Sequence, residues 1–225
     1  MIKLLEKDNI GFTLSEVLIT LVIIGVVAAI TLPTIYADYI EREKIAKVKK
    51  MYSTLGNAIT FVKTEGGDLY FDNPEDTQEE INEWYDIYLR RRLHTMKVCQ
   101  GNVTQVKDCW TQPKCLNGNC GGVGTGNAMV SAILTDGTTI MMDRWTPSTF
   151  GVISKYGETD GIIFYFDING SKAPNTIGKD IFVSVFISQE GFVPAYRDRT
   201  RSEIDSNCSK SGNGVSCIMK YLNKS

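Results

Sequence analysis

Glu16 is the residue whose type and position most clearly suggest chemistry, because it precedes a long stretch without charge. No charged residue occurs from Val17 to Ala37. A helix of about 20 such residues is roughly 30 Å long, enough to cross the apolar core of a bilayer. A carboxylate at the edge of such a span costs about 2–3 kcal/mol on insertion scales. Glu16 therefore needs a partner.

One partner is local. Thr13-x-x-Glu16 has the spacing of a capping box, in which Thr13 is the N-cap and Glu16 accepts a hydrogen bond from its backbone N–H. An acid in the first turn also interacts favourably with the helix dipole. This interpretation gives Glu16 a structural role, and spacing alone does not separate it from a functional one.

The residues around Glu16 also resemble a known signal. The stretch Gly11-Phe12-Thr13-Leu14-x-Glu16, followed by an apolar run, is similar to the class III signal of type IV prepilins and type II secretion pseudopilins. Pro33 resembles the helix-breaking proline that many pilins carry after the first apolar run. The resemblance is close over residues 11–36 and otherwise concerns only the architecture.

The resemblance implies a sequence of processing events. Residues 1–11 would be a leader, which a membrane aspartyl peptidase cuts after Gly11, and the same prepilin peptidase/methyltransferase would methylate the new amine of Phe12. That amine would pair with Glu16 of a neighbouring subunit, because an isolated carboxylate is costly in a low dielectric. The implied partners are other pilin subunits, in homo- or hetero-oligomers, and an assembly platform in the inner membrane.

Six cysteines lie beyond the apolar run, and their even number favours disulfides and an oxidising compartment. Six cysteines allow fifteen pairings. We expect the local pair Cys208–Cys217, which closes a loop rich in Ser, Gly and Asn, and for the others a nested arrangement of Cys109–Cys115 within Cys99–Cys120. A zinc site is the alternative, but the spacing contains no C-x-x-C and fits zinc poorly.

Charge gives a conflicting indication of topology. Five basic residues follow the apolar run within residues 42–50 and only Lys3 and Lys7 precede it, so the positive-inside rule favours a cytoplasmic C-terminal part. The cysteines and the resemblance favour the opposite: a single-pass protein of the inner (cytoplasmic) membrane, with its soluble domain outside the cytoplasm, which then enters a filament. The formal net charge of −2 gives no reason to expect nucleic-acid binding.

The hydrophobic pattern divides the chain into a rod and a domain. We expect a transmembrane or filament-core helix over residues 12–37, with a kink at Pro33, and an amphipathic continuation over residues 38–66 that ends at Gly66-Gly67. Apolar residues recur there at three-to-four spacing, namely at Ile45, Val48, Met51 or Tyr52, Leu55, Ala58 or Ile59, and Val62.

Residues 67–225 are expected to form one globular domain. Asp72–Asp76 has the features of a helix start, and the pattern predicts a short helix from there to about Thr95. Val98–Thr125 is expected to be a disulfide-bonded loop without packed structure. Period-two patterns predict antiparallel strands at Ala128–Thr135, Thr138–Asp143, Gly161–Asp167, Ile181–Ser188 and Phe192–Ala195. The expected fold class is α+β: a pilin fold with a long N-terminal helix packed on an antiparallel sheet.

Other candidate sites are weaker. The polar stretch from Asp167 to Asp180 carries carboxylates and amides that suit Ca²⁺, although the same residues form ordinary turns. His94, the only histidine, has no evident nucleophile partner, and no carboxylate pair is marked for hydrolysis. We therefore expect no cofactor, no metal and no catalysis. The expected function is that of a structural pilin or pseudopilin subunit; the alternatives are a tip subunit for adhesion or DNA uptake, and a membrane-anchored periplasmic enzyme.

Overall fold

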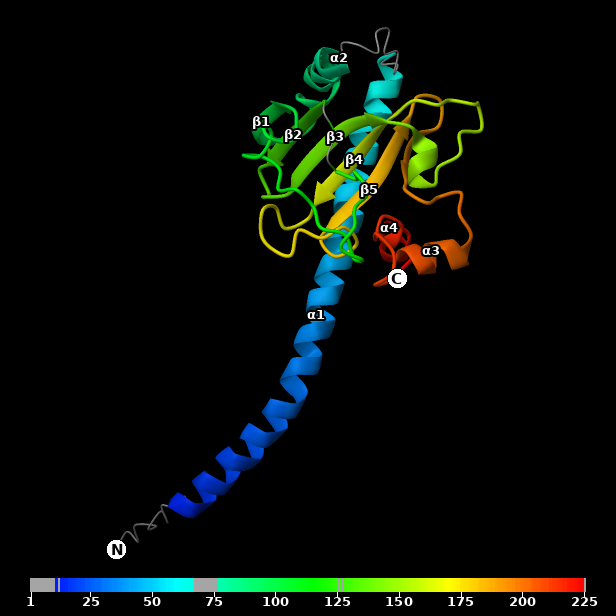
Figure 1. Ribbon diagram of the computed structural model, residues 1–225. Helices are drawn as coiled ribbons and strands as arrows, with labels where there is room; N and C mark the ends of the chain where they lie inside the picture. The colour runs from blue at the N-terminus through cyan, green and yellow to red at the C-terminus, as the bar shows by residue number, and fades with distance from the viewer. Residues whose placement is uncertain (1–10, 12, 67–76, 125, 127, 225) are drawn as a thin grey trace, which may run out of the picture. The chain divides into compact units, whose positions relative to one another are not determined.

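The computed structural model describes residues 11, 13–66, 77–124, 126 and 128–224. The chain forms two compact units that meet between Glu43 and Lys44. Helix α1 (Leu14–Thr64) contributes to both units, and every other helix and strand described belongs to the second (Figure 1). The predicted α+β class, with a long apolar N-terminal helix and an antiparallel sheet, is confirmed.

Helix α1 runs for 51 residues without interruption. It continues through Pro33, which has no N–H to donate to the preceding turn, and the kink itself stays a prediction. The helix ends where expected. Gly66 adopts a left-handed φ of +74° that suits glycine, and its N–H donates to the carbonyl of Lys63. Gly67 and the predicted helix start at Asp72–Asp76 lie outside the described residues.

The sheet is a meander in which each strand pairs with the next along the chain. Its order is β1-β2-β3-β4-β5-β6 and every pairing is antiparallel. At the Asp136-Gly137 turn, the N–H of Leu134 donates to the carbonyl of Thr138 over 2.8 Å. The strands are β1 (Thr95–Gly101), β2 (Met129–Leu134), β3 (Thr139–Trp145), β4 (Gly161–Asp167), β5 (Ile181–Ile187) and β6 (Gly191–Pro194).

The five predicted strands are confirmed, but the sequence interpretation missed β1. Residues 95–101 were expected to follow a helix and open a loop, whereas they pair with β2 along its whole length. Met96 and Lys97 are exposed, so this edge strand lacks the alternation of apolar and polar residues by which the other strands are recognised.

The two faces of the sheet have different covers. On one face, Phe164 of β4 packs against Phe192 of β6, and Phe192 contacts Tyr52 of α1 at a ring-centroid distance of 5.2 Å. This face therefore packs on the second half of α1. The predicted apolar stripe is confirmed, since the buried residues of α1 are Val48, Met51, Leu55, Ala58, Ile59 and Val62.

The other face is covered by the cysteine-rich segment between β1 and β2. The ring of Tyr165 in β4 packs near the ring of Trp110, with 6.3 Å between the ring centroids. The Tyr165 hydroxyl accepts a hydrogen bond from the N–H of Gly124. Val106 is fully buried and Trp110 is 4% exposed. The expectation that this segment is an unpacked loop was therefore wrong: its apolar residues are too widely spaced for a periodic pattern, yet they complete the core.

Short helices surround the sheet. The predicted second helix ends earlier than expected, because α2 (Thr77–Trp84) passes into a π-helical turn, η1 (Tyr85–Leu89). A 3₁₀ turn, η2 (Pro147–Phe150), follows β3. The C-terminal helices α3 (Arg201–Asn207) and α4 (Cys217–Leu222) were not predicted. Thr200 and Glu203 form a capping box at the start of α3, the same signal that marks the start of α1.

The six cysteines form three local disulfides: Cys99–Cys109, Cys115–Cys120 and Cys208–Cys217. The last pairing was predicted correctly, and the nested pairing of the other four was wrong. The physical reason is strand β1, which carries Cys99; the chain turns directly after it, where Gln105 donates to the carbonyl of Asn102. Cys109 thereby comes within a Cα separation of 5.9 Å of Cys99. No cysteine is free, which excludes the zinc alternative.

Candidate functional site: the N-terminal half of helix α1

The start of α1 is a capping box. The N–H of Thr13 donates to Oε2 of Glu16 over 2.8 Å, and the N–H of Glu16 donates to the Thr13 hydroxyl oxygen over 3.3 Å. The Thr13 hydroxyl also donates to the same Glu16 oxygen over 2.7 Å. The local role predicted for Glu16 is therefore confirmed, and it fixes the carboxylate at the first turn of the helix.

Two hydroxyl groups of the apolar run are satisfied by the helix itself. The hydroxyls of Thr20 and Thr31 donate to the carbonyls of Val17 and Val27, each over 2.9 Å. Such bonds keep a hydroxyl paired without water. This matters in a bilayer, where every polar group must find its partner within the protein.

The apolar side chains of this half of α1 lack cover within the described chain. Ile30 is 70% exposed and Leu18 is 55% exposed. An apolar surface of this extent marks a membrane or protein interaction site. Of the helices in the described part of the chain, α1 alone is long and apolar enough to cross a membrane, and none of its most apolar stretch is buried. Further exposed residues are Leu14, Val17, Ile19, Leu21, Val22, Ile23, Ile24, Val26, Val27, Leu32 and Ile35.

The structure places the predicted site residues in separate regions. Gly11 is exposed ahead of α1, and apart from its chain neighbours no atom of the described residues lies within 4 Å of the position that a Cβ would occupy there. Glu16 and Pro33 lie on the uncovered half of α1, whereas all six cysteines lie in the sheet domain. Phe12 lies outside the described residues. Cleavage, methylation and assembly therefore stay predictions.

The polar loop between β4 and β5 satisfies its own carboxylates. Asp180 is 3% exposed and accepts from the N–H groups of Asn175 and Thr176 over 2.8 and 2.6 Å. Asp167 is 2% exposed and accepts from the N–H of Asn169 over 3.0 Å. Burial, together with the negative charge of Asp180, raises the pKa of Asp167 to about 7. Contacts between carboxylates and nearby backbone N–H groups are typical of turns, as in the second interpretation of this loop.

A second buried acid, Asp143 of β3, was not singled out from the sequence. It is 8% exposed, and burial raises its pKa to about 7. It lines a small cavity of about 30 Å³ with Tyr165, under the segment Gly121–Val123. Burial also raises the pKa of Tyr165. The sequence could have indicated this buried acid only through its position in β3, a strand with both faces covered.

His94 is exposed and its carbonyl accepts a hydrogen bond from the N–H of Thr135. Since every cysteine is in a disulfide, a Cys–His pair is excluded.

Comparison with known proteins finds one family model and two curated relatives that are similar to parts of this chain. A family model described as the prokaryotic N-terminal methylation motif matches residues 7–32. Two curated relatives from Pseudomonas aeruginosa, each named "Fimbrial protein", are 38% identical over 76 residues, which is 33% of this chain and 49% of each relative. The chain thus spans about half the length of the curated relatives it matches. No solved structure matches.

The matched residues include Gly11, Thr13 and Glu16, whose geometry is described above, and most of the uncovered apolar run. Over residues 7–32 the chain therefore carries a prokaryotic N-terminal methylation motif, and it is similar to two fimbrial proteins over part of its length.

Proposed function

We propose that this chain is a structural subunit of a type IV pilus, anchored in the inner membrane by the first half of α1 until it joins the filament. The observation that carries the proposal is a methylation motif that continues into an apolar helix surface without cover in the described chain. A bilayer covers that surface before assembly, and the helices of other subunits cover it afterwards.

In this proposal the peptidase cuts between Gly11 and Phe12 and methylates the new amine. The capping contacts of Glu16 involve Thr13, which stays in the chain after the cut. Both contacts use Oε2, so in this proposal Oε1 is the oxygen that accepts from the amine of a neighbouring subunit. Glu16 thereby has two consecutive roles: it caps its own helix, and it then neutralises a charged chain end in the filament core.

Fimbrial relatives favour a pilus over a secretion pseudopilus, and the sheet domain then works as a building block rather than as an enzyme. Electron microscopy of the assembled material distinguishes extended surface pili from short periplasmic pseudopili.

Mass spectrometry of the mature membrane protein tests the processing step. We expect the N-terminal peptide to begin at Phe12 and to carry a methyl group on its amine. An intact Met1 end in functional material would refute the proposal.

Replacement of Glu16 tests the assembly step. Glu16→Gln keeps the shape and the capping acceptor but removes the charge, so we expect a processed membrane protein that does not enter filaments. The matched control is Glu79→Gln, which changes an exposed first-turn acid of α2. Sheared filaments are quantified by immunoblot against the membrane pool, and wild-type incorporation of Glu16→Gln would contradict the pairing role.

A further inference from the structure

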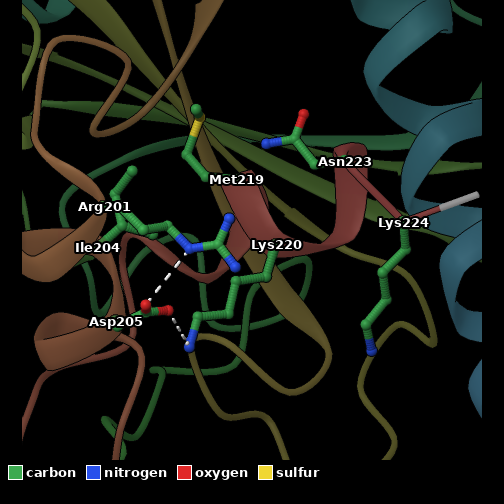
Figure 2. A pocket seen from close by; sticks show the side chains of 7 residues that line it. All are labelled: Arg201, Ile204, Asp205, Met219, Lys220, Asn223 and Lys224. Atoms are coloured by element: carbon green, nitrogen blue, oxygen red, sulfur yellow. Dashed lines mark hydrogen bonds and ion pairs between the residues drawn. The ribbon is translucent and has the colours of Figure 1, made fainter.

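Helices α3 and α4 form a basic pocket at the end of the chain. The pocket has a volume of about 250 Å³, and Arg201, Lys220 and Lys224 lie among its lining residues with a single acid, Asp205. Asp205 bonds both Arg201, over 3.3 Å, and Lys220, over 2.9 Å. Figure 2 shows these two cations converging on the one carboxylate. Positive charge therefore exceeds negative charge in this pocket.

Lysines of α1 extend the pocket into a larger surface. The ring of Tyr221 is near one lysine of α1 and one lysine of the pocket: the ammonium of Lys44 is 5.9 Å from its centroid, and that of Lys224 is 5.3 Å away. The ammonium of Lys49 donates to the carbonyl of Lys224. We call Lys44, Lys49, Arg201, Lys220 and Lys224 the basic surface.

The sequence of α1 adds to this charge. Residues 44–50 contain four lysines and no acid. Lys50 pairs with Asp136, and Lys49 belongs to the basic surface. The chain as a whole has a formal net charge of −2, so the local excess of positive charge is not an average property of the protein.

The covalent chain keeps one member of the basic surface, Lys44, close to the apolar run. Lys44 is seven residues beyond Ala37, the last residue before the first charge after the run. Seven helical residues advance about 10 Å, and even a fully extended chain reaches no further than about 25 Å. If α1 spans the bilayer, Lys44 is within reach of the lipid headgroups.

We propose that the basic surface binds the headgroups of anionic phospholipids while the subunit is still anchored in the membrane. The ligand chemistry is a phosphate monoanion or diester, held by ammonium and guanidinium groups. Lysines beside an anionic surface attract it strongly within a Debye length. The proposal rests on the membrane insertion of α1 contained in the proposed function, and it adds a lipid partner for the domain.

The test measures lysine accessibility in the full chain. The protein is reconstituted in vesicles of phosphatidylcholine alone or of phosphatidylcholine mixed with phosphatidylglycerol, and a membrane-impermeant amine reagent labels it. Peptide mass spectrometry then gives the labelling rate of each lysine. We expect phosphatidylglycerol to slow labelling of Lys220 and Lys224 by about fivefold, the effect of roughly one cation at an anionic surface. High salt should restore the rate.

Lys172 and Lys179, exposed in the loop between β4 and β5, are the internal controls and should label equally in both vesicles. The double variant Lys44→Gln/Lys224→Gln should lose most of the protection at Lys220, whereas Lys172→Gln/Lys179→Gln should keep it. The double variant Lys44→Gln/Lys224→Gln leaves Arg201 and Lys220 unchanged, so Asp205 keeps these two partners.

Equal labelling of Lys220 and Lys224 in the two kinds of vesicle overturns the proposal. So does protection that appears in phosphatidylcholine alone and grows with protein density, because that result assigns the surface to a second copy of the chain. Failure of the lipid proposal can be told apart from failure of the proposed pilus function. A chain that inserts but is never methylated at Phe12 still shows lipid-dependent protection, and a chain that assembles normally with equal labelling contradicts only the lipid proposal.

Discussion

The two halves of α1 are built from one continuous helix but meet different surroundings. In the half that ends near Tyr36, apolar residues occur on every side and are exposed, as Ile24 and Ile30 are. In the half that begins at Lys44, apolar residues form one stripe, in which Val48 and Leu55 are fully buried against the sheet. A helix that is apolar all round requires an apolar environment, whereas an amphipathic helix needs only one covered face. The protein therefore carries its own cover for one half, whereas the apolar surface of the other half has no cover within the described chain.

The largest effect on the free energy of unfolding is expected when an apolar side chain of α1 is truncated. This effect should occur only in the half of α1 that packs on the sheet. Leu55→Ala should lower the free energy of unfolding of the domain by about 4 kcal/mol, as expected for a fully buried leucine. Ile24→Ala should leave it unchanged. All three tryptophans, Trp84, Trp110 and Trp145, lie in the sheet domain. Their fluorescence during urea unfolding of the detergent-solubilised chain therefore reports this domain alone. Equal effects of the two variants would contradict the division.

The sheet domain and the first half of α1 should also differ in how their stability depends on pH. Asp143 and Asp167 have folded pKa values of about 7, whereas an unfolded Asp releases its proton near pH 4. The stabilisation from these bound protons is complete below about pH 4 and is lost as the pH rises through 7. Between pH 5 and 7.5 the domain should lose about 3 kcal/mol per group.

Asp143→Asn should remove the part of this pH-dependent loss of stability that comes from Asp143. The measurement is tryptophan-detected urea unfolding at a series of pH values. Asp160→Asn, which changes an exposed acid next to β4, is the control and should keep the wild-type slope. A domain as stable at pH 7.5 as at pH 5 would contradict the assignment. The run Val17–Ala37 holds no charged residue, so the helix content of this half should not change over the same range.

The smallest effect is expected from replacing one glycine in each half of α1 by alanine. A Cβ at Gly56 would meet Phe192 at 3.7 Å, an ordinary contact, and a Cβ at Gly25 would meet nothing within 4 Å. Alanine is favoured over glycine inside a helix by about 1 kcal/mol. Gly56→Ala should therefore raise the unfolding free energy of the domain by up to about 1 kcal/mol, while Gly25→Ala should leave it unchanged. A loss of stability in Gly56→Ala would show that the helix and β6 tolerate no added methyl group.

Prediction from the sequence succeeded where a periodic pattern was strong. The helix stripe from Val48 to Val62 and the five strands after Ala128 follow from spacing, because one face of each element packs on the core. The start of α1 was readable from Thr13 and Glu16. The same capping signal is present at Thr200 and Glu203, but α3 was not predicted, because it is too short to show a hydrophobic period.

The failures share a physical cause. Strand β1 is an edge strand with exposed Met96 and Lys97, and its pairing depends on β2, which lies almost 30 residues further along the chain. Without β1, the position of Cys99 was unknown, and the disulfide partner of Cys99 could not be derived. The basic surface likewise joins α1 to residues 201–224, and no local pattern indicates such a contact.

The order of the sheet has a consequence for how the domain matures. Each strand pairs with the strand that follows it, from β1 to β6, and each disulfide closes between residues at most 10 positions apart. Contacts that are short-range in sequence form quickly. The sheet can thus grow hairpin by hairpin as the chain becomes available for folding, with no early strand waiting for a late one. Even slow delivery of such a chain leaves no long unpaired edge exposed to aggregation.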